Sequence, residues 1–138
     1  MKILLINGSP NKNGQTMTLA HQFLKDKEYQ TLHLVDYKIY SYGQKFDDDQ
    51  FDEVVFQMSQ SDMIVIGSPV YWHSMSGAIR NLLDRFYGYV DENLLKGKDM
   101  YFIFQGYAPT AKQLEAGEYT MKRFASLYGM NYKGMITK

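Results

Sequence analysis

The 138-residue sequence contains no cysteine, and this absence excludes several chemistries at once. Without thiols, these residues form no disulfide, no cysteine nucleophile, no cysteine-held iron–sulfur cluster and no cysteine-based zinc site. An excess of positive charge is also missing, because 15 Lys and Arg balance 15 Asp and Glu, so nucleic acid is not an expected partner. His21, His33 and His73 lie far apart without the spacing of paired metal ligands, so no metal site is predicted.

Long hydrophobic runs are absent as well. No apolar stretch approaches the roughly 20 residues of a membrane-spanning helix, so no membrane contact is expected. The chain enters an apolar segment at Ile3 without a signal-peptide pattern, which predicts a cytoplasmic location. The length fits a single domain over residues 1–138. Aromatic residues are abundant, with 12 Tyr and 8 Phe, and they would suit a planar aromatic ligand.

The first sixteen residues predict a strand, a polar loop and the start of a helix. Residues 3–6 are wholly apolar and too short for a helix, which is typical of a strand buried on both faces. A strand, loop and helix start in this order favour phosphate binding, because the first helical N–H groups are unpaired and carry partial positive charge. The candidate phosphate ligands are the small polar groups of the loop, namely Ser9, Asn11, Asn13, Gly14, Gln15 and Thr16.

Two familiar phosphate loops do not fit this segment. A Walker A loop needs a Lys followed by Ser or Thr after its last glycine, but Gln15 follows Gly14 here. The GxGxxG spacing of a dinucleotide-binding loop is also absent. An ordinary strand-to-helix connection, in which Asn and Gly only form turns and caps, remains the alternative interpretation.

Hydrophobic periodicity predicts five strands that alternate with four helices. The strands are expected at residues 3–6, 29–35, 63–66, 100–104 and 130–136, and the helices at 16–27, 51–60, 76–87 and 111–128. Ser76 is a candidate N-cap, residues 70–75 are expected to form an aromatic loop, and the acidic run at 47–49 a solvated approach to a helix. This alternation predicts an α/β fold with a doubly wound parallel sheet in the order 2-1-3-4-5, in which the loops after strands one and three are neighbours.

Two segments carry a family resemblance. The sequences GSPNKNGQT at 8–16 and GSPVYWHSMSGAIRNLLDR at 67–85 resemble the NAD(P)H-dependent FMN reductase family of flavodoxin-like proteins. The similarity extends in order over most of the chain. It implies a flavodoxin-like fold, an FMN cofactor and NADH or NADPH as the electron donor. No basic cluster for a 2′-phosphate can be identified, so the choice between the two donors stays open.

The resemblance also implies that three loops bind different parts of FMN. The first loop would hold the FMN phosphate with the residues named above. The second would lie along the isoalloxazine ring, and the third would close its other side. These ring contacts are Pro69, Val70, Tyr71, Trp72 and His73 in the second loop and Gln105, Gly106 and Tyr107 in the third. Structural alternatives exist: Tyr71 and Trp72 capping the core, Pro69 ending a strand, and Gln105–Gly106 forming a plain turn.

The implied activity is a hydride transfer from NAD(P)H to flavin and onward to a quinone, a free flavin, or a nitro or azo compound. No side chain needs to act as a catalytic nucleophile, because the flavin carries the chemistry. One alternative is a flavodoxin-type electron carrier for a protein partner, although such carriers are usually acidic and this chain is balanced. Another is a fold relative that has lost its cofactor and serves only as an oligomeric binding domain.

The sequence departs from its relatives in two ways. Residues 36–44 read DYKIYSYGQ where an iron–sulfur branch of these flavoproteins carries clustered cysteines, so no cluster is expected. The sequence also ends after the fifth strand, where the fold usually adds a helix. The first helix would then cover one sheet face alone and leave part of it open, which predicts a homodimer.

Overall fold

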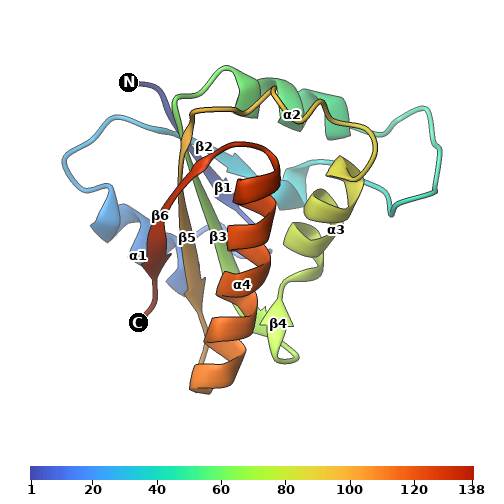
Figure 1. Ribbon diagram of the computed structural model, residues 1–138. Coiled ribbons are helices and arrows are strands. Elements are labelled where there is room, and N and C mark those ends of the chain that lie inside the picture. Colours follow the sequence, from blue (N-terminus) through green and yellow to red (C-terminus); the bar gives the residue numbers. More distant parts are fainter.

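A computed structural model describes all 138 residues. Five parallel strands form the sheet in the order β2-β1-β3-β5-β6, and β4 pairs antiparallel with the end of β3. Four helices connect the parallel strands (Figure 1). The strands are β1 (Ile3–Asn7), β2 (Gln30–His33), β3 (Met63–Tyr71), β4 (Ser74–Met75), β5 (Asp99–Gln105) and β6 (Asn131–Ile136). The helices are α1 (Gln15–Phe23), α2 (Phe51–Ser59), α3 (Gly77–Phe86) and α4 (Ala111–Leu127). The flavodoxin-like fold class and the predicted order of the five parallel strands are confirmed.

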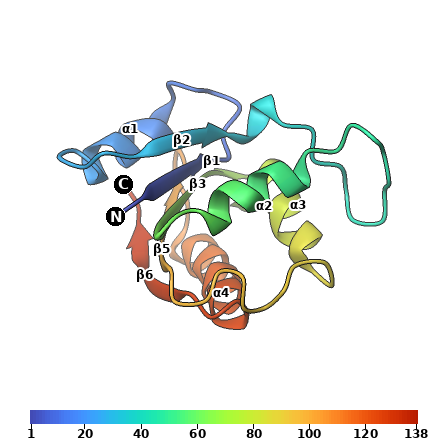
Figure 2. The same cartoon turned by 90° about the horizontal axis from the view of Figure 1, so that it is seen from above.

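Helices cover both faces of the sheet: α2, α3 and α4 lie on one side and α1 on the other (Figure 2). The side chains of β3 alternate accordingly: Ile64 and Ile66 belong to the 24-residue core under α2, α3 and α4, and Val65 to the 8-residue core under α1. The expectation that part of the α1 face would be left uncovered does not hold at Val65 and Ile103, which α1 leaves fully buried. Among the apolar side chains of the strands on that face, Tyr101 and Ile136 stay partly exposed.

Some element boundaries differ from the sequence-based expectation. Helix α1 ends at Phe23, since the residues after the buried Leu24 are polar and have nothing to pack against the sheet. Strand β2 stops at His33 and passes into a 3₁₀ turn over Leu34–Asp36. The aromatic loop at 70–75 is a β-hairpin, because β3 runs on to Tyr71 and pairs with β4.

Helix α4 approaches β5 closely at Gly117. A Cβ at this position would lie 2.3 Å from a ring carbon of Phe104, so only glycine lets the helix lie this near to the strand. Glycine has a low helix propensity, and the close packing of α4 on β5 offsets this cost. The N-terminal end of α4 lies at the same end of the sheet as β4 (Figure 1).

No helix in the structure has both the length and the apolar character needed to cross a membrane.

Candidate functional site

The loop after β1 is organised by Asn7, a fully buried side chain at the end of the strand. Its Oδ1 accepts a hydrogen bond from the Ser9 backbone N–H at 3.0 Å. Its Nδ2 donates to the Asn11 carbonyl at 3.2 Å and to Nδ1 of His33 at 3.0 Å. The Ser9 hydroxyl in turn accepts from the Asn11 N–H at 3.1 Å. These bonds hold the loop in one shape before any ligand arrives.

The N-terminus of α1 stands open at the end of this loop. Its N-cap is Gly14, which has no side chain to cap the helix, and the first turn contains no acidic residue. The first N–H groups of the helix therefore lack a side-chain partner, and they carry the partial positive charge of a helix N-terminus. Two buried hydroxyls lie in the loop and the first turn, those of Ser9 and Thr16. This donor set fits a phosphate group.

Cationic side chains contribute little to this loop. Lys12 is its one cation, and the ammonium lies 2.8 Å from the Asp36 carboxylate, where both side chains are about half exposed. Asn11, Asn13 and Gln15 are exposed, and their side chains form no hydrogen bond with the other two predicted loops. The loop thus offers an anion mostly neutral donors.

The loops after β1 and β3 meet side by side, as their adjacent strands require. Asn7 pairs with Gly67 in the sheet, and the Gly8 N–H donates to the Gly67 carbonyl at 2.8 Å. A Cβ at Gly8 would lie 2.2 Å from Cγ1 of Ile79, so the close approach of α3 requires glycine there. The Ser76 hydroxyl donates to the Gly8 carbonyl at 2.7 Å and accepts from the Ile79 N–H, which confirms Ser76 as the α3 N-cap.

The second predicted loop is the hairpin formed by β3 and β4. Pro69 and Val70 lie within β3, and the two-residue turn consists of Trp72 and His73. Both turn residues have positive φ, 47° and 67°, a conformation that costs a residue with a side chain about 1–2 kcal/mol. The turn projects the Trp72 side chain into solvent, where it is 93% exposed.

The third predicted loop lies against the other two. Gln105 is buried at the end of β5, and its Nε2 donates to the Thr16 hydroxyl at 3.0 Å. A Cβ on Gly106 would come within 3.0 Å of the Val70 Cβ. The structure therefore brings together residues from all three loops. Between the hairpin and this third loop lies a cavity of about 280 Å³, lined by Val70, Trp72, His73, Gly106, Tyr107, Ala108, Pro109 and Gln113.

A second cavity lies on the other side of the hairpin. It measures about 230 Å³, and its walls come from the first loop, the 3₁₀ turn and the start of α3. The lining residues are Gly8, Ser9, Pro10, Val35, Tyr71, Ser76, Gly77 and Ala78. Tyr71 of the hairpin lines this cavity, whereas its neighbours Trp72 and His73 line the first. Six of the predicted cofactor residues line one of these two cavities: Ser9 and Tyr71 line the second, and Val70, Trp72, His73 and Gly106 line the first. The remaining predicted residues line neither, namely Asn11, Asn13, Gly14, Gln15, Thr16, Pro69 and Gln105.

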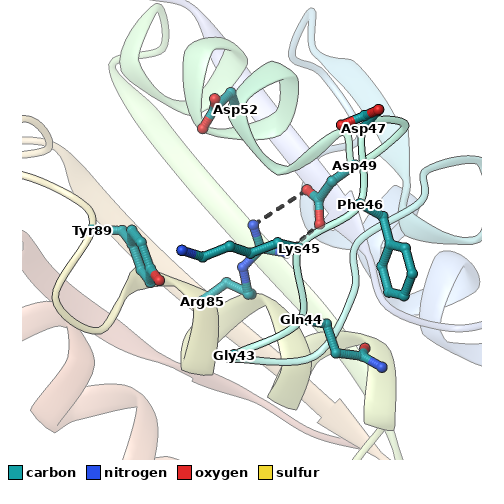
Figure 3. A pocket seen from close by; sticks show the side chains of 9 residues that line it. All are labelled: Gly43, Gln44, Lys45, Phe46, Asp47, Asp49, Asp52, Arg85 and Tyr89. Carbon is teal, nitrogen blue, oxygen red and sulfur yellow. Dashed lines mark hydrogen bonds and ion pairs between the residues drawn. The ribbon is translucent and has the colours of Figure 1, made fainter.

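A third cavity, of about 320 Å³, is polar and contains none of the predicted cofactor residues (Figure 3). The loop at 43–49 forms its wall, and Asp49 pairs with Arg85 of α3 at 2.5 Å. The expectation of a fully solvated acidic run is therefore wrong for Asp49, whose side chain is only 15% exposed. Burial alone would raise the pKa of Asp49, but hydrogen bonds from Arg85 and from the backbone N–H groups of Phe51 and Tyr40 outweigh it and lower the pKa.

Sequence reasoning missed the residues that support the loops. Asn7 follows an apolar strand and precedes Gly-Ser-Pro, a context in which Asn forms Asx turns, so the signal was present. Ser68 accepts a hydrogen bond from the Ser76 N–H at 2.8 Å. Gln113 contacts His73. Neither of these two contacts has a local signal, since each joins residues from different elements.

Fold and loop arrangement define the class of flavodoxin-like α/β proteins. Comparison with known families narrows this class. Residues 1–135 match the family described as NADPH-dependent FMN reductase, so the chain belongs to that family of oxidoreductases.

Curated relatives include a protein with a related description. An iron–sulfur flavoprotein of Archaeoglobus fulgidus is 36% identical over 97 residues, covering 62% of this chain and 48% of the relative. A putative NAD(P)H-dependent FMN-containing oxidoreductase of Bacillus subtilis, YwqN, is 27% identical over 94 residues, covering 62% and 52%. The chain thus spans about half the length of these curated relatives.

Solved structures share the fold at lower identity. The Trp repressor binding protein from Bacillus subtilis superposes with a TM-score of 0.82 at 22% identity, covering 98% of this chain and 84% of that one. An FMN-dependent NADH-azoreductase from Bacillus anthracis, solved in complex with FMN, gives 0.75 at 14% identity, covering 99% and 86%.

Proposed function

We propose that this chain binds FMN through its three loops and transfers electrons from NAD(P)H to a small-molecule acceptor in the cytoplasm, as a single domain. The observation that carries the proposal is the uncapped N-terminus of α1, which adjoins a loop already shaped by Asn7 and joined to the other two loops. Family membership supports the same cofactor and donor.

The residues of the first loop would bind the terminal phosphate. The hydroxyls of Ser9 and Thr16 and the first backbone N–H groups of α1 are donors, and the amides of Asn11, Asn13 and Gln15 stand at the exposed rim. The Gln105–Thr16 hydrogen bond orients the Thr16 hydroxyl, because that oxygen already accepts and is left free to donate its proton. Gly14 keeps the helix end clear of any competing side chain.

The hairpin and the third loop would flank the planar ring. Bound FMN would supply the hydride chemistry, which no side chain of this protein can perform. Backbone N–H groups of these two loops are the candidate donors to the ring, and Tyr71 and Trp72 would exclude water from it. The predicted ring contacts from Pro69 to His73, with Gln105 and Gly106, all belong to this proposal.

Acceptor class and donor preference are the finer parts of the proposal. Quinones, free flavins, nitro compounds and azo compounds are the acceptors to test, since azoreductases are among the structural neighbours. The family description names NADPH and one neighbour's description names NADH. Lys12 offers little help to a 2′-phosphate, since its ammonium is already paired with Asp36.

An absorbance spectrum of the purified protein, recorded before and after FMN addition and dialysis, tests the proposal. We expect oxidised-flavin bands that NAD(P)H bleaches and a quinone restores. Flavin bands that NAD(P)H does not bleach would favour the electron-carrier alternative. A protein that retains no FMN would contradict the cofactor assignment.

We also propose a homodimer. The partly exposed Tyr101 and Ile136 on the α1 face of the sheet support it. A single monomeric species in light scattering at micromolar concentration would contradict this part of the proposal.

A further inference from the structure

The turn of the β3–β4 hairpin is tied to the N-terminal end of α4 by one side-chain contact, between Nδ1 of His73 and Nε2 of Gln113. The hairpin lies beside this end of α4 (Figure 1). The two residues are 40 positions apart in sequence, and both line the 280 Å³ cavity. This contact is the only hydrogen bond that the His73 side chain makes within the protein.

The orientation of the Gln113 amide is set by the helix cap. The Thr110 backbone N–H can only donate, and it donates to Oε1 of Gln113 at 3.0 Å. The Thr110 hydroxyl completes a capping box by accepting from the Gln113 N–H at 3.2 Å. With Oε1 held by the cap, the group that faces His73 is the NH₂ of the amide, which is a donor with no acceptor capacity.

We propose that Gln113 is a positioning residue that sets the tautomer of the neutral His73 imidazole, with the proton on Nε2. Nδ1 must accept the hydrogen bond from Gln113, so the ring proton resides on the other nitrogen. Nε2–H is then the group left over for a ligand. The other residues that line the cavity carry no carboxylate and no cation. Nε2–H of His73 is therefore one of a few neutral polar groups there, beside the indole N–H of Trp72 and the hydroxyl of Tyr107.

A donor of this kind recognises a carbonyl oxygen. This part of the inference rests on the proposed function, in which two molecules with a carbonyl enter the site: a quinone-type acceptor and the carboxamide of NAD(P)H. Trp72 and His73 both adopt positive φ, where Asn and Gly are the usual residues. Such backbone strain is typical of functional sites, which supports a ligand-binding role for His73.

Two variants separate the positioning role from a merely structural one. Gln113→Glu keeps the cap, since a carboxylate still accepts from the Thr110 N–H and Glu is itself a capping-box residue. It replaces the donor facing Nδ1 by an acceptor, so the proton should move to Nδ1. Thr110→Val is the matched control, because it weakens the cap by removing the hydroxyl but leaves the Gln113–His73 contact in place.

Two-bond ¹H–¹⁵N spectra of the full chain, recorded without FMN at a pH where histidine is neutral, report the tautomer directly. His73→Gln identifies the His73 signals among those of the three histidines. We expect the Nε2–H tautomer in the native protein and in Thr110→Val, and the Nδ1–H tautomer in Gln113→Glu. A native Nδ1–H tautomer, a mixture of both, or no change in Gln113→Glu would overturn the assignment.

Steady-state kinetics of the FMN-loaded protein tests the ligand. Relative to Thr110→Val, Gln113→Glu should raise the KM of the carbonyl-bearing ligand about three- to tenfold, the loss typical of one neutral hydrogen bond. A rise in the quinone KM would support the acceptor as that ligand, and a rise in the NADH KM would support the nicotinamide. A tautomer change without either rise would overturn the ligand assignment, and a failure to retain FMN would overturn the proposed function while the spectra still decide the tautomer.

Discussion

The loop after β1 and the β3–β4 hairpin lie side by side and are held in opposite ways. The first loop is fixed by hydrogen bonds that centre on the buried Asn7. The hairpin turn is exposed, has two residues at positive φ and is tied to α4 through His73. A loop held by many hydrogen bonds, beside a turn with one long-range contact, suits the proposed site, which would keep FMN bound and exchange its other ligands. Four measurements test this difference between the two regions.

Replacing the centre of the first loop should have the largest effect. Asn7→Ala leaves the Ser9 N–H, the Asn11 carbonyl and His33 without their partner. We expect the free energy of unfolding in urea to fall by about 2–4 kcal/mol and the FMN dissociation constant to rise about 100-fold. Asn13→Ala, in the same loop but exposed, should cost less than about 0.5 kcal/mol. Equal losses in the two variants would show that Asn7 does not organise the loop.

Breaking the ion pair of the polar cavity tests whether a region away from the loops acts independently of them. The pKa of Asp49 is lowered in the folded protein, so its stabilisation is complete above its ordinary value of 3.8 and is lost as pH falls through the lower folded value. Asp49→Asn should therefore cost about 1–2 kcal/mol at pH 7 and remove this part of the acid dependence. Its FMN affinity should change less than about threefold, as judged by fluorescence titration.

The exposed Asp47 is the control for that experiment, because it forms no ion pair. Asp47→Asn should leave both the unfolding free energy and its acid dependence unchanged within about 0.5 kcal/mol. A large loss of FMN affinity in Asp49→Asn would mean that the polar cavity and the cofactor loops are coupled.

Relieving the hairpin turn should stabilise the protein slightly. Trp72→Gly and Trp72→Ala remove the same exposed ring, but only glycine adopts positive φ without cost. Thermal or urea unfolding should find the glycine variant more stable than the alanine variant by about 1 kcal/mol. If the alanine variant is as stable as the glycine variant or more stable, the positive φ at Trp72 has no cost in stability.

Charge should have the smallest effect on the first loop. Lys12 is already paired with Asp36 at the surface, and the proposed phosphate ligands are neutral. Lys12→Ala is expected to change the FMN dissociation constant less than about threefold, and raising the salt concentration should do equally little. A steep salt dependence in the titration would instead point to a cation as the main phosphate ligand.

Sequence reasoning succeeded where a signal is local. Apolar runs predicted the central strands, periodicity predicted the four helices, and Ser76 was recognisable as a cap by its residue type and place. The hairpin escaped prediction because Trp72 and His73 are not the residues that two-residue turns usually contain. Asp49 was misjudged because its partner, Arg85, lies 36 residues further along the chain.

The class of fold, the family and the order of the three loops can be predicted from the sequence, because they follow from patterns within short segments. How the loops are joined is visible only in the folded protein: Gln105 bonds to Thr16, Ser76 to Gly8, and His73 to Gln113. The tertiary structure also decided that one helix suffices to bury Val65 and Ile103. The physical reason is that such contacts depend on distances between elements, and a distance in space between remote residues has no local signature along the chain.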